Sequence, residues 1–316
     1  MSCRLHIDTD FAGDPDDACA LAMLLGSPDV DVIGITTSLE DGGRRHDCVR
    51  FFLDLACQAD IPTAAGFDQT LTQQRFDCTW NDPAHWPEQP LHAPSTAGAA
   101  FDLLTDAIES DATVLAIGGF TNLAALELAR PGSLIGARVV AMAGWVDDPP
   151  ANWPQWGPSM DFNTQCDTSA AHIVANSGAA LTLVTLPVAM RVTLREQHLP
   201  RLRASGRIGA LLARQSERHR QTSGFADLAH DHASLPAGLV NFHWDPVAAG
   251  VALGWDCIVV RPTTITAVQE AGVVAFRASG DEGTDRISVS VDAPDFEERW
   301  MQCVERSIRK DSNVCF

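Results

Sequence analysis

The sequence predicts an α/β protein built on a mostly parallel, open sheet with helices on both faces. First, strand-like and helix-like segments alternate along the 316 residues, which is the order of successive βαβ units. Second, polar clusters follow several strand-like segments, as expected where the carboxyl ends of parallel strands meet at one edge. Third, no internal repeat or linker divides the chain, so we expect a single domain over residues 1–316.

The clearest pair of elements lies near the N-terminus. Residues 3–7 form a short, apolar-leaning run, which is long enough for one strand. Gly13 allows a tight turn, and Asp14-Pro15 is typical of a helix start, with Asp14 as the N-cap and Pro15 at the first helical position. Residues 18–25 continue as a buried helix. The order is therefore strand, acidic loop and helix.

The later elements are expected from the same patterns. Apolar runs predict strands at residues 30–37, 62–65, 113–117, 137–142 and 181–186. Helical patterns predict helices at residues 44–58, from a Ser95-Thr96 cap to 108, at 122–129, from an Asp167 cap to 176, at 194–223 and at 247–253. A meander of short strands over 263–291 and an amphipathic helix over 294–308 close the chain. Residues 69–94 and 147–158 are irregular, which in a compact domain usually indicates a functional segment.

Composition narrows the classes of partner. The formal net charge is −19 and no basic block is present, which argues against binding of nucleic acids and of anionic membranes. The favoured ligand is neutral or cationic. The nine cysteines are scattered, odd in number and without a CxxC pair, so we expect reduced thiols. With no signal-peptide core and no apolar run near the roughly 20 residues of a membrane helix, a cytoplasmic location is expected.

One stretch carries an unusual density of charge. Five carboxylates fall within the ten residues from Asp8 to Asp17, at Asp8, Asp10, Asp14, Asp16 and Asp17. Such crowding raises pKa values or loosens a fold, unless a hard divalent cation with oxygen ligands offsets the repulsion. This predicts a Ca²⁺ or Mg²⁺ site. The alternative is that Asp14, Asp16 and Asp17 cap a helix and complement its dipole, but this leaves Asp8 and Asp10 unexplained.

Other polar clusters are expected at the same edge of the sheet. They cover residues 38–41, 118–122, 155–167 and 241–246. The last contains Asp245-Pro246, which repeats the helix-start signature of Asp14-Pro15, so capping is again the alternative reading. Since the carboxyl ends of parallel strands converge, these clusters predict a shared pocket.

Four of these motifs resemble, in order, those of the inosine-uridine preferring nucleoside hydrolases. Asp8-Thr9-Asp10 followed by Asp16-Asp17-Ala18 is similar to the N-terminal fingerprint of that family. The segment 117–124, Ile-Gly-Gly-Phe-Thr-Asn-Leu-Ala, is similar to its Gly-Pro-Leu-Thr-Asn-Ile-Ala segment. Asp161-Phe162-Asn163 resembles its Glu-Phe-Asn segment, and Asp245 matches the late Asp of its His-Asp motif.

The resemblance implies a Rossmann-like nucleoside-hydrolase fold that cleaves the N-glycosidic bond of ribonucleosides with Ca²⁺ in the pocket. It implies that the calcium ligands are Asp10, Asp17, the carbonyl of Ile117 and Asp245. A metal-bound water would attack with Asp10 as general base, and Asp16, Asp161 and Asn163, with Phe162 between the last two, would contact ribose. A role in nucleoside salvage and a homodimer or homotetramer are also expected.

The sequence departs from the family pattern at several positions. Two extra residues precede Asp16, so Asp14 is a further sugar- or metal-binding candidate. Asp41 stands where Asn is usual, Asp161 is shorter than the usual Glu, and Asn152 or Gln155 would have to contact the 5′-hydroxyl.

The leaving-group position departs as well. Trp244 stands where many members have a histidine acid, while His243 and His85 are other candidates, with structural histidines as the alternative. Trp244 resembles the purine-specific branch, in which aromatic rings sandwich the base. Trp80 or Trp86 would then be the second ring, and a merely packed Trp244 is the alternative.

Two other functions remain open from the sequence. Asp8-Thr9-Asp10 after a strand also suggests a Mg²⁺-dependent phosphohydrolase of the haloacid-dehalogenase type, although Ala12 and the negative charge do not favour it. The altered positions also allow a protein that binds a nucleoside or ribose without turnover.

Overall fold

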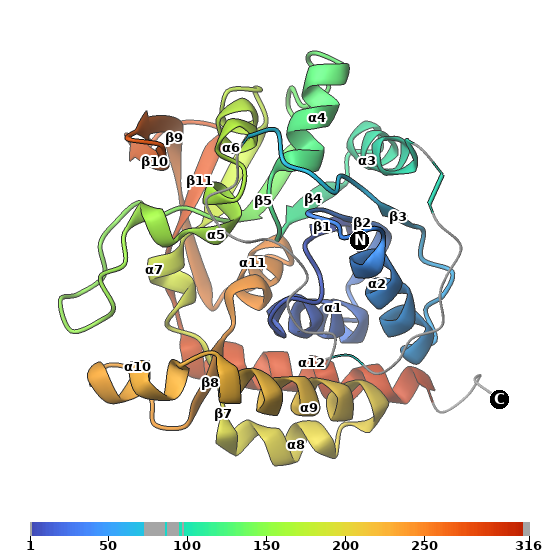
Figure 1. The fold of residues 1–316 in the computed structure, drawn as a ribbon, viewed down its shortest axis with the longest axis vertical. Coiled ribbons are helices and arrows are strands. Elements are labelled where there is room, and N and C mark those ends of the chain that lie inside the picture. The colour runs from blue at the N-terminus through green and yellow to red at the C-terminus, as the bar shows by residue number, and fades with distance from the viewer. Residues whose placement is uncertain (1, 73–85, 87–94, 97, 312–316) are drawn as a thin grey trace.

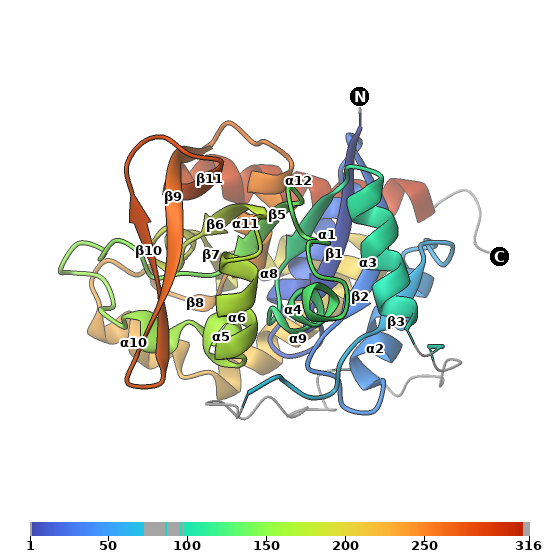
Figure 2. The same ribbon diagram turned by 90° about the horizontal axis from the view of Figure 1, so that it is seen from above.

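The computed structural model describes residues 2–72, 86, 95–96 and 98–311. Its main sheet has nine strands in this described part, in the order β10-β9-β11-β6-β5-β4-β1-β2-β3. From β3 to β11 the neighbours are parallel, whereas β9 is antiparallel to both β11 and β10. Helices lie on both sides of this sheet (Figures 1 and 2). The predicted fold class, an open and mostly parallel α/β sheet, is confirmed.

The elements have the following bounds. The sheet strands are β1 Cys3–Thr9, β2 Val30–Thr37, β3 Thr63–Ala65, β4 Thr113–Ala116, β5 Arg138–Met142, β6 Ala180–Val184, β9 Ile258–Glu270, β10 Val273–Ser279 and β11 Asp285–Val291. A separate antiparallel pair joins β7 Thr193–Arg195 to β8 Leu239–Phe242.

The longer helices are α1 Asp16–Gly26, α2 Arg44–Leu55, α3 Ala99–Glu109, α4 Thr121–Ala129, α6 Thr168–Ala175, α9 Gly206–Thr222, α11 Trp244–Ala252 and α12 Ala293–Asp311. The shorter ones are α5 Phe162–Gln165, α7 Leu186–Ala189, α8 Leu199–Arg203 and α10 Phe225–Asp231, with 3₁₀ turns at Pro158–Met160 and Glu196–His198. Within the described residues, no helix combines the length and apolarity that crossing a bilayer would require.

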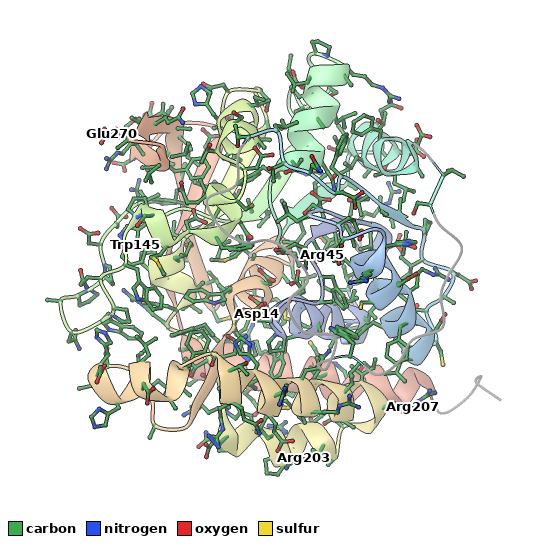
Figure 3. All side chains as sticks on the ribbon, viewed as in Figure 1. Asp14, Arg45, Trp145, Arg203, Arg207 and Glu270 are labelled. Carbon is green, nitrogen blue, oxygen red and sulfur yellow. The ribbon has the colours of Figure 1, made fainter. Side chains whose placement is uncertain are left out.

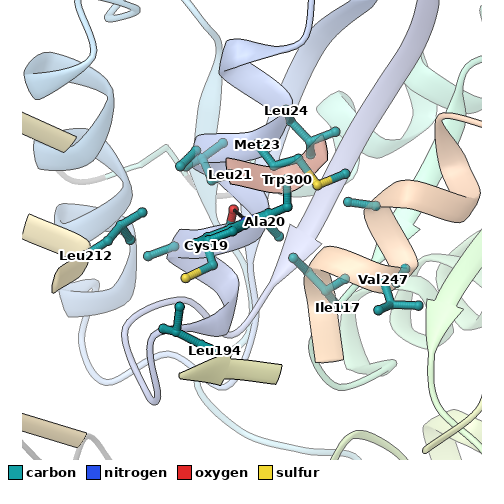
Figure 4. Close-up of a cluster of buried hydrophobic side chains, with 14 of the residues drawn as sticks. Cys19, Ala20, Leu21, Met23, Leu24, Ile117, Leu194, Leu212, Val247 and Trp300 are labelled. Carbon is teal, nitrogen blue, oxygen red and sulfur yellow. Dashed lines mark hydrogen bonds between the residues drawn. The ribbon is translucent and has the colours of Figure 1, made fainter. Parts of the chain in front are cut away.

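Two apolar cores lie on opposite faces of the sheet, because side chains alternate along each strand. In β4, Leu115 belongs to the core shared with α1, α2, α9, α11 and α12, whereas Val114 belongs to the core shared with α3, α4 and α6. In the first core the indole nitrogen of Trp300 donates to the carbonyl oxygen of Cys19, 3.1 Å away, which ties α12 to α1 (Figure 4). This anchors the helix that follows the acidic loop.

Several expected helix starts differ from the structure. The cap at Asp167 is confirmed, because its carboxylate accepts a hydrogen bond from the Ala170 amide. The cap at Asp14 is wrong, since Pro15 is the N-cap of α1 and no side chain caps it. The Ser95-Thr96 cap is also wrong, since α3 begins after Gly98, whose positive φ of 84° suits glycine. The Ser95 hydroxyl instead accepts a hydrogen bond from the Ala65 amide, 2.8 Å away, so a contact with β3 takes the place of a cap.

The C-terminal half also differs in detail. The strand β7 lies at Thr193–Arg195, where the start of a helical region was expected, because it pairs with the distant β8. The expected meander begins earlier, at Ile258, and extends the main sheet. The expectation of reduced thiols is wrong at Cys57, which is disulfide-bonded.

Candidate active site

The acidic loop lies where the strand order of the sheet reverses. β1 is hydrogen-bonded to β2 on one side and to β4 on the other, so the loops that leave β1 and β4 start next to each other. In open α/β sheets, ligands bind in the crevice at such a point. Gly118, in the turn after β4, permits close packing there, because a Cβ on it would lie 2.6 Å from the Asp10 amide nitrogen. The two loops therefore touch through their backbones.

Five carboxylates gather at this edge of the sheet. Asp10 and Asp14 are half-buried, while Asp16, Asp17 and Asp245 are buried. One carboxylate oxygen from each of Asp14, Asp16 and Asp17 lies within 4.8 Å of the others. Asp245, from α11, interacts electrostatically with Asp17 and Asp10. Figure 3 labels Asp14 beside α1, near the middle of the molecule. The structure thus brings the distant Asp245 to the acidic loop.

Burial and mutual repulsion raise the pKa values of these groups. Burial, followed by the neighbouring carboxylates, raises the pKa of Asp16 and of Asp245 well above the ordinary aspartate range. The pKa of Asp17 is raised for the same reasons, with burial first and Asp10 second. Burial raises the pKa of Asp10 to about 6, although the Arg45 guanidinium lowers it. The cluster is therefore an unfavourable concentration of negative charge at neutral pH.

Side-chain capping does not account for these residues, although Asp16 and Asp17 lie in the first turn of α1, where a carboxylate complements the helix dipole. No side chain caps α1, so Asp14 is not engaged in capping it. Asp245 lies inside the first turn of α11, whose N-cap is His243, again without a side-chain cap. The Asp16 carboxylate accepts a hydrogen bond from the Asp17 amide, 3.1 Å away.

The donor set of this cluster fits a hard divalent cation. All five side chains offer carboxylate oxygens, which Ca²⁺ and Mg²⁺ prefer. A bound cation would also relieve the repulsion that raises their pKa values. These residues therefore fit the calcium ion that the resemblance implies.

The carbonyl of Ile117, the fourth expected ligand, lies at the end of β4. Its oxygen accepts a hydrogen bond from the Asn163 side-chain amide, at 3.2 Å. The same amide nitrogen lies 3.0 Å from the carbonyl oxygen of Met142, at the end of β5. Asn163 is half-buried and so links the ends of two neighbouring strands at the candidate site.

Asp161 is held by the protein's own donors. Its carboxylate accepts from the Gly144 amide at 2.6 Å and from the backbone and side chain of Thr164, which makes it the N-cap of α5. Burial raises the pKa of Asp161 to about 6. The next residue, Phe162, packs against Leu39. The expected contact of Asp161 with ribose stays a prediction.

A buried network under the site was missed by sequence reasoning. The carboxylate of Asp8 accepts from Thr36 at 2.6 Å and from the Asn122 amide at 2.7 Å. Asn122 also donates to the Thr37 carbonyl and accepts from the Phe67 amide. Asn122 thereby joins the ends of β1 and β2 and the segment after β3. Burial raises the pKa of Asp8 to about 7. The sequence signal that could have found this network was Asn122, a polar residue near the start of an otherwise apolar helix.

Arg45 was also missed, and Glu40 was expected only as part of the polar cluster over residues 38–41. Arg45 is 4% exposed and donates to backbone carbonyl oxygens of the loops after β1 and β2. Glu40 is buried, and its carboxylate accepts from the backbone amides of Arg45 and His46 at the start of α2. No local motif distinguishes these two residues from surface charges.

Three residues that were expected to contact the substrate are at least partly exposed, and the hydrogen bonds and ion pair described for them do not involve the carboxylate cluster. Asp41 is partly exposed and forms an ion pair with Arg44 at 2.9 Å. Asn152 is exposed. Gln155 is exposed, and its amide donates to three carbonyls of its own loop, including that of Trp153 at 3.0 Å. Their roles in binding stay predictions.

Aromatic rings gather around Trp244. The Trp244 ring lies 4.6 Å from that of Phe242 and 6.2 Å from that of Trp156, measured between centroids. Trp244 and Trp156 are both only partly buried. The nearest indole to Trp244 in the described chain thus comes from the loop between β5 and α5.

The other expected ring and the histidines have different surroundings. Trp86 is buried against Phe11, with ring centroids 5.3 Å apart, so it belongs to the core. Trp80 and His85 lie outside the described residues. His243 is buried 4.3 Å from the Trp300 ring centroid, and burial lowers its pKa to about 3. A neutral, buried His243 favours the structural alternative over a catalytic acid.

Two cavities lie away from the carboxylate cluster. One of about 650 Å³ is lined by the start of α2, the segment after β3 and the start of α3. The other, of about 480 Å³, lies between β9, β11 and α12. Neither is lined by any of the five clustered carboxylates, so the candidate site rests on side-chain chemistry at the sheet edge.

Comparison with known proteins places this geometry in a family. The family model for inosine-uridine preferring nucleoside hydrolases matches residues 5–298. The chain is 30% identical over 220 residues to the pyrimidine-specific ribonucleoside hydrolase RihA of Photobacterium profundum, covering 64% of this chain and 66% of that protein. It is 30% identical over 226 residues to the non-specific ribonucleoside hydrolase RihC of Salmonella enteritidis, covering 67% and 71%.

Solved structures share the fold over nearly the whole chain. A purine-preferring ribonucleoside hydrolase from Gardnerella vaginalis superposes with a TM-score of 0.81 at 20% identity, covering 96% of this chain and 99% of that one. The plant nucleoside hydrolase PpNRh1 gives a TM-score of 0.77 at 20% identity, with the same coverage. Because the family model spans almost all of the sequence, the chain belongs to the inosine-uridine preferring nucleoside hydrolase family of enzymes.

Proposed function

We propose that this protein hydrolyses the N-glycosidic bond of ribonucleosides to free base and ribose, depends on Ca²⁺, and prefers purine bases. One observation carries the proposal: Asp245 of α11 lies close enough to Asp10 of the acidic loop and to Asp17 of α1 to interact with both electrostatically, at the reversal point of the sheet. Membership of the nucleoside hydrolase family supports the reaction class. A cytoplasmic location and a homodimer or homotetramer stay part of the proposal.

The carboxylates would hold the ion and the sugar. Asp10, Asp17 and Asp245, with the Ile117 carbonyl, would bind Ca²⁺, and Asp14 is an additional oxygen donor within the same cluster. Bound there, Ca²⁺ supplies a positive charge that orients ribose hydroxyls and polarises a water molecule. Asp16 and Asn163 would contact the ribose hydroxyls, which favours ribose over 2-deoxyribose.

The side chains also match the charge that develops during cleavage. Breaking an N-glycosidic bond gives the sugar ring oxocarbenium character, and neighbouring carboxylates stabilise that positive charge. Asp10, to which the resemblance assigns the role of general base and which lies half-buried in this cluster, would accept the proton from the attacking water. General-base assistance of this kind contributes roughly 10²–10⁴ in rate.

The preference for purines rests on aromatic rings. Trp244 and Trp156 lie 6.2 Å apart between ring centroids, and both are partly exposed. A purine presents a larger aromatic face than a pyrimidine, so contact with these indoles would favour purine nucleosides. The names of the relatives range from pyrimidine-specific to purine-preferring, so the preference proposed for this chain rests on its own aromatic rings.

One assay separates this proposal from the two alternatives. The purified protein is incubated with inosine, uridine or p-nitrophenyl phosphate, in Ca²⁺ and in EDTA. We expect ribose release that is faster with inosine than with uridine and is lost in EDTA. Phosphate release would indicate the phosphohydrolase, and nucleoside binding without ribose release would indicate a binding protein.

A further inference from the structure

We infer that Arg45 is a positioning residue that holds the acidic loop and the loop after β2 in the arrangement that receives the cation. Arg45 is the second residue of α2, two residues beyond the loop that leaves β2. It is 4% exposed, although arginine is rarely buried without a specific role. Figure 3 labels Arg45 on the side of α2 that faces the middle of the molecule.

The guanidinium bridges two loops that are far apart in sequence. Its Nε donates to the carbonyl oxygen of Leu39, 2.8 Å away, in the loop after β2. Its Nη1 donates to the carbonyl oxygen of Phe11, 3.0 Å away, and to that of Asp10, both in the acidic loop. The planar fork of arginine suits such a bridge, because its donors point in fixed directions.

The bridged backbone is in an unfavourable conformation on both sides. Leu39 has a φ of +53°, and Ala12, which follows the bonded carbonyl of Phe11, has a φ of +81°. Residues with a side chain rarely adopt positive φ, and such conformations persist only where the surroundings hold them. The contacts of Arg45 fall at these two places.

The start of α2 is itself fixed, so that Arg45 can act as a rigid support. The carboxylate of Glu40 accepts from the Arg45 and His46 amides at 3.2 and 2.9 Å. Thr37, the last residue of β2, donates to the same carboxylate. Arg45 is therefore connected through α2 and Glu40 to the sheet and, through its side chain, to the backbone of Asp10.

Because Arg45 is positively charged, the direction in which cation affinity changes when it is removed tests its role. It lies near Asp10 and Asp17, since it lowers the pKa of both. If Arg45 acted only through charge, its removal would strengthen binding of a cation. If it positions the loop, its removal weakens that binding, because the carboxylates lose their arrangement. Residues that support metal ligands typically contribute about 10–100-fold to metal affinity.

The first experiment does not depend on calcium. Hydrogen exchange of the EDTA-treated protein is compared for the wild type and Arg45→Met. We expect faster exchange confined to residues 9–14 and 38–41, by about tenfold or more. Arg50→Met is the matched control, because Arg50 lies on the same helix and also donates to a backbone carbonyl, that of Ala59 at 3.1 Å. Unchanged exchange at both loops in Arg45→Met would overturn the inference.

The second experiment rests on the proposed function and measures Ca²⁺ affinity by calorimetry. We expect Arg45→Met to weaken Ca²⁺ affinity about tenfold relative to the wild type. The affinity of Arg45→Lys should be close to that of Arg45→Met, because one ammonium group cannot bridge both loops. Affinity that is unchanged or tighter in Arg45→Met, or fully restored in Arg45→Lys, would contradict positioning. A wild type that binds no Ca²⁺ would instead contradict the proposed function, and the exchange experiment would still decide on Arg45. Arg45→Gln is used if Arg45→Met does not fold.

Discussion

The side-chain amide of Asn163 donates to the carbonyl oxygen of Ile117, 3.2 Å away, and lies 3.0 Å from the carbonyl oxygen of Met142. Ile117 follows β4 and Met142 ends β5, so one amide nitrogen joins the carboxyl ends of two neighbouring strands. The Ile117 carbonyl is also the expected backbone ligand of the cation. Asn163 thus connects the segment that is proposed to bind the sugar to the one that is proposed to bind the cation.

Replacing Asn163 should therefore impair both stability and activity. In Asn163→Ala two carbonyls lose their donor, which costs about 1–3 kcal/mol in the free energy of unfolding. We also expect kcat/KM for inosine to fall by about tenfold or more, because the Ile117 carbonyl loses its orientation. Urea denaturation and steady-state kinetics measure the two effects.

A second asparagine provides the control for that change. Asn176→Ala also removes an amide that donates to a backbone carbonyl, that of His172 at 2.7 Å, but this contact is exposed at the end of α6. We expect Asn176→Ala to lower the free energy of unfolding by less than about 0.5 kcal/mol and to leave kcat/KM for inosine unchanged. Equal effects of the two substitutions would show that Asn163 has no special role.

The sequence predicted the fold well where the information is local. Apolar runs located β4, β5 and β6, because strands buried on both faces are nearly continuously apolar, and apolar-leaning runs located β1 and β2. The cap at Asp167 was found because a capping side chain bonds within three residues. Resemblance to a family added the pairing of Asp245 with the acidic loop, which no local pattern contains.

The rest of the site depends on contacts between distant residues. Asn122 bonds to Asp8 across 114 positions, and Arg45 bonds to Phe11 across 34, so neither contact leaves a periodic signal. Trp86 resembled a stacking ring by composition, yet it packs against Phe11 in the core. Asp14 resembled a helix cap, but its oxygen lies with those of Asp16 and Asp17. In each case tertiary packing decided the role of the side chain.

The stability of the calcium-free protein should fall as the pH rises from about 6.5 to 8.5. Burial raises the pKa of Asp8 to about 7 and those of Asp16 and Asp245 well above the ordinary aspartate range, so the folded state keeps protons that the unfolded chain has already lost. Each proton that the folded state still holds makes stability fall by about 1.4 kcal/mol per pH unit, and for Asp8 this loss ends as the pH passes its folded pKa of about 7. Unfolding by urea in EDTA at both pH values measures the effect.

The pH range from about 6.5 to 8.5 separates the effect of the carboxylates on stability from that of the histidines. Burial lowers the pKa values of His6 and His243 to about 3, which makes stability rise with pH, but only below the ordinary histidine value near 6.5. Excess Ca²⁺ should remove most of the loss at pH 8.5, because it binds the deprotonated carboxylates. Stability that is constant or rising in EDTA would mean that these aspartates are already ionised in the folded protein.

Trp244 should matter more for purine than for pyrimidine nucleosides. Its ring lies 4.6 Å from Phe242 and 6.2 Å from Trp156, and it is partly exposed beside the residue Asp245 of the cluster. A stacked indole contributes about 0.5–1.5 kcal/mol beyond its buried area, and a purine offers the larger face. We expect Trp244→Ala to lower kcat/KM for inosine about tenfold more than for uridine. Trp244→Phe keeps a ring and should retain most of the preference for inosine.

Trp156→Ala should shift the ratio of kcat/KM for inosine to that for uridine in the same direction, because its indole lies beside that of Trp244. Equal losses on the two substrates in Trp244→Ala would mean that this ring packs the start of α11 and does not select the base.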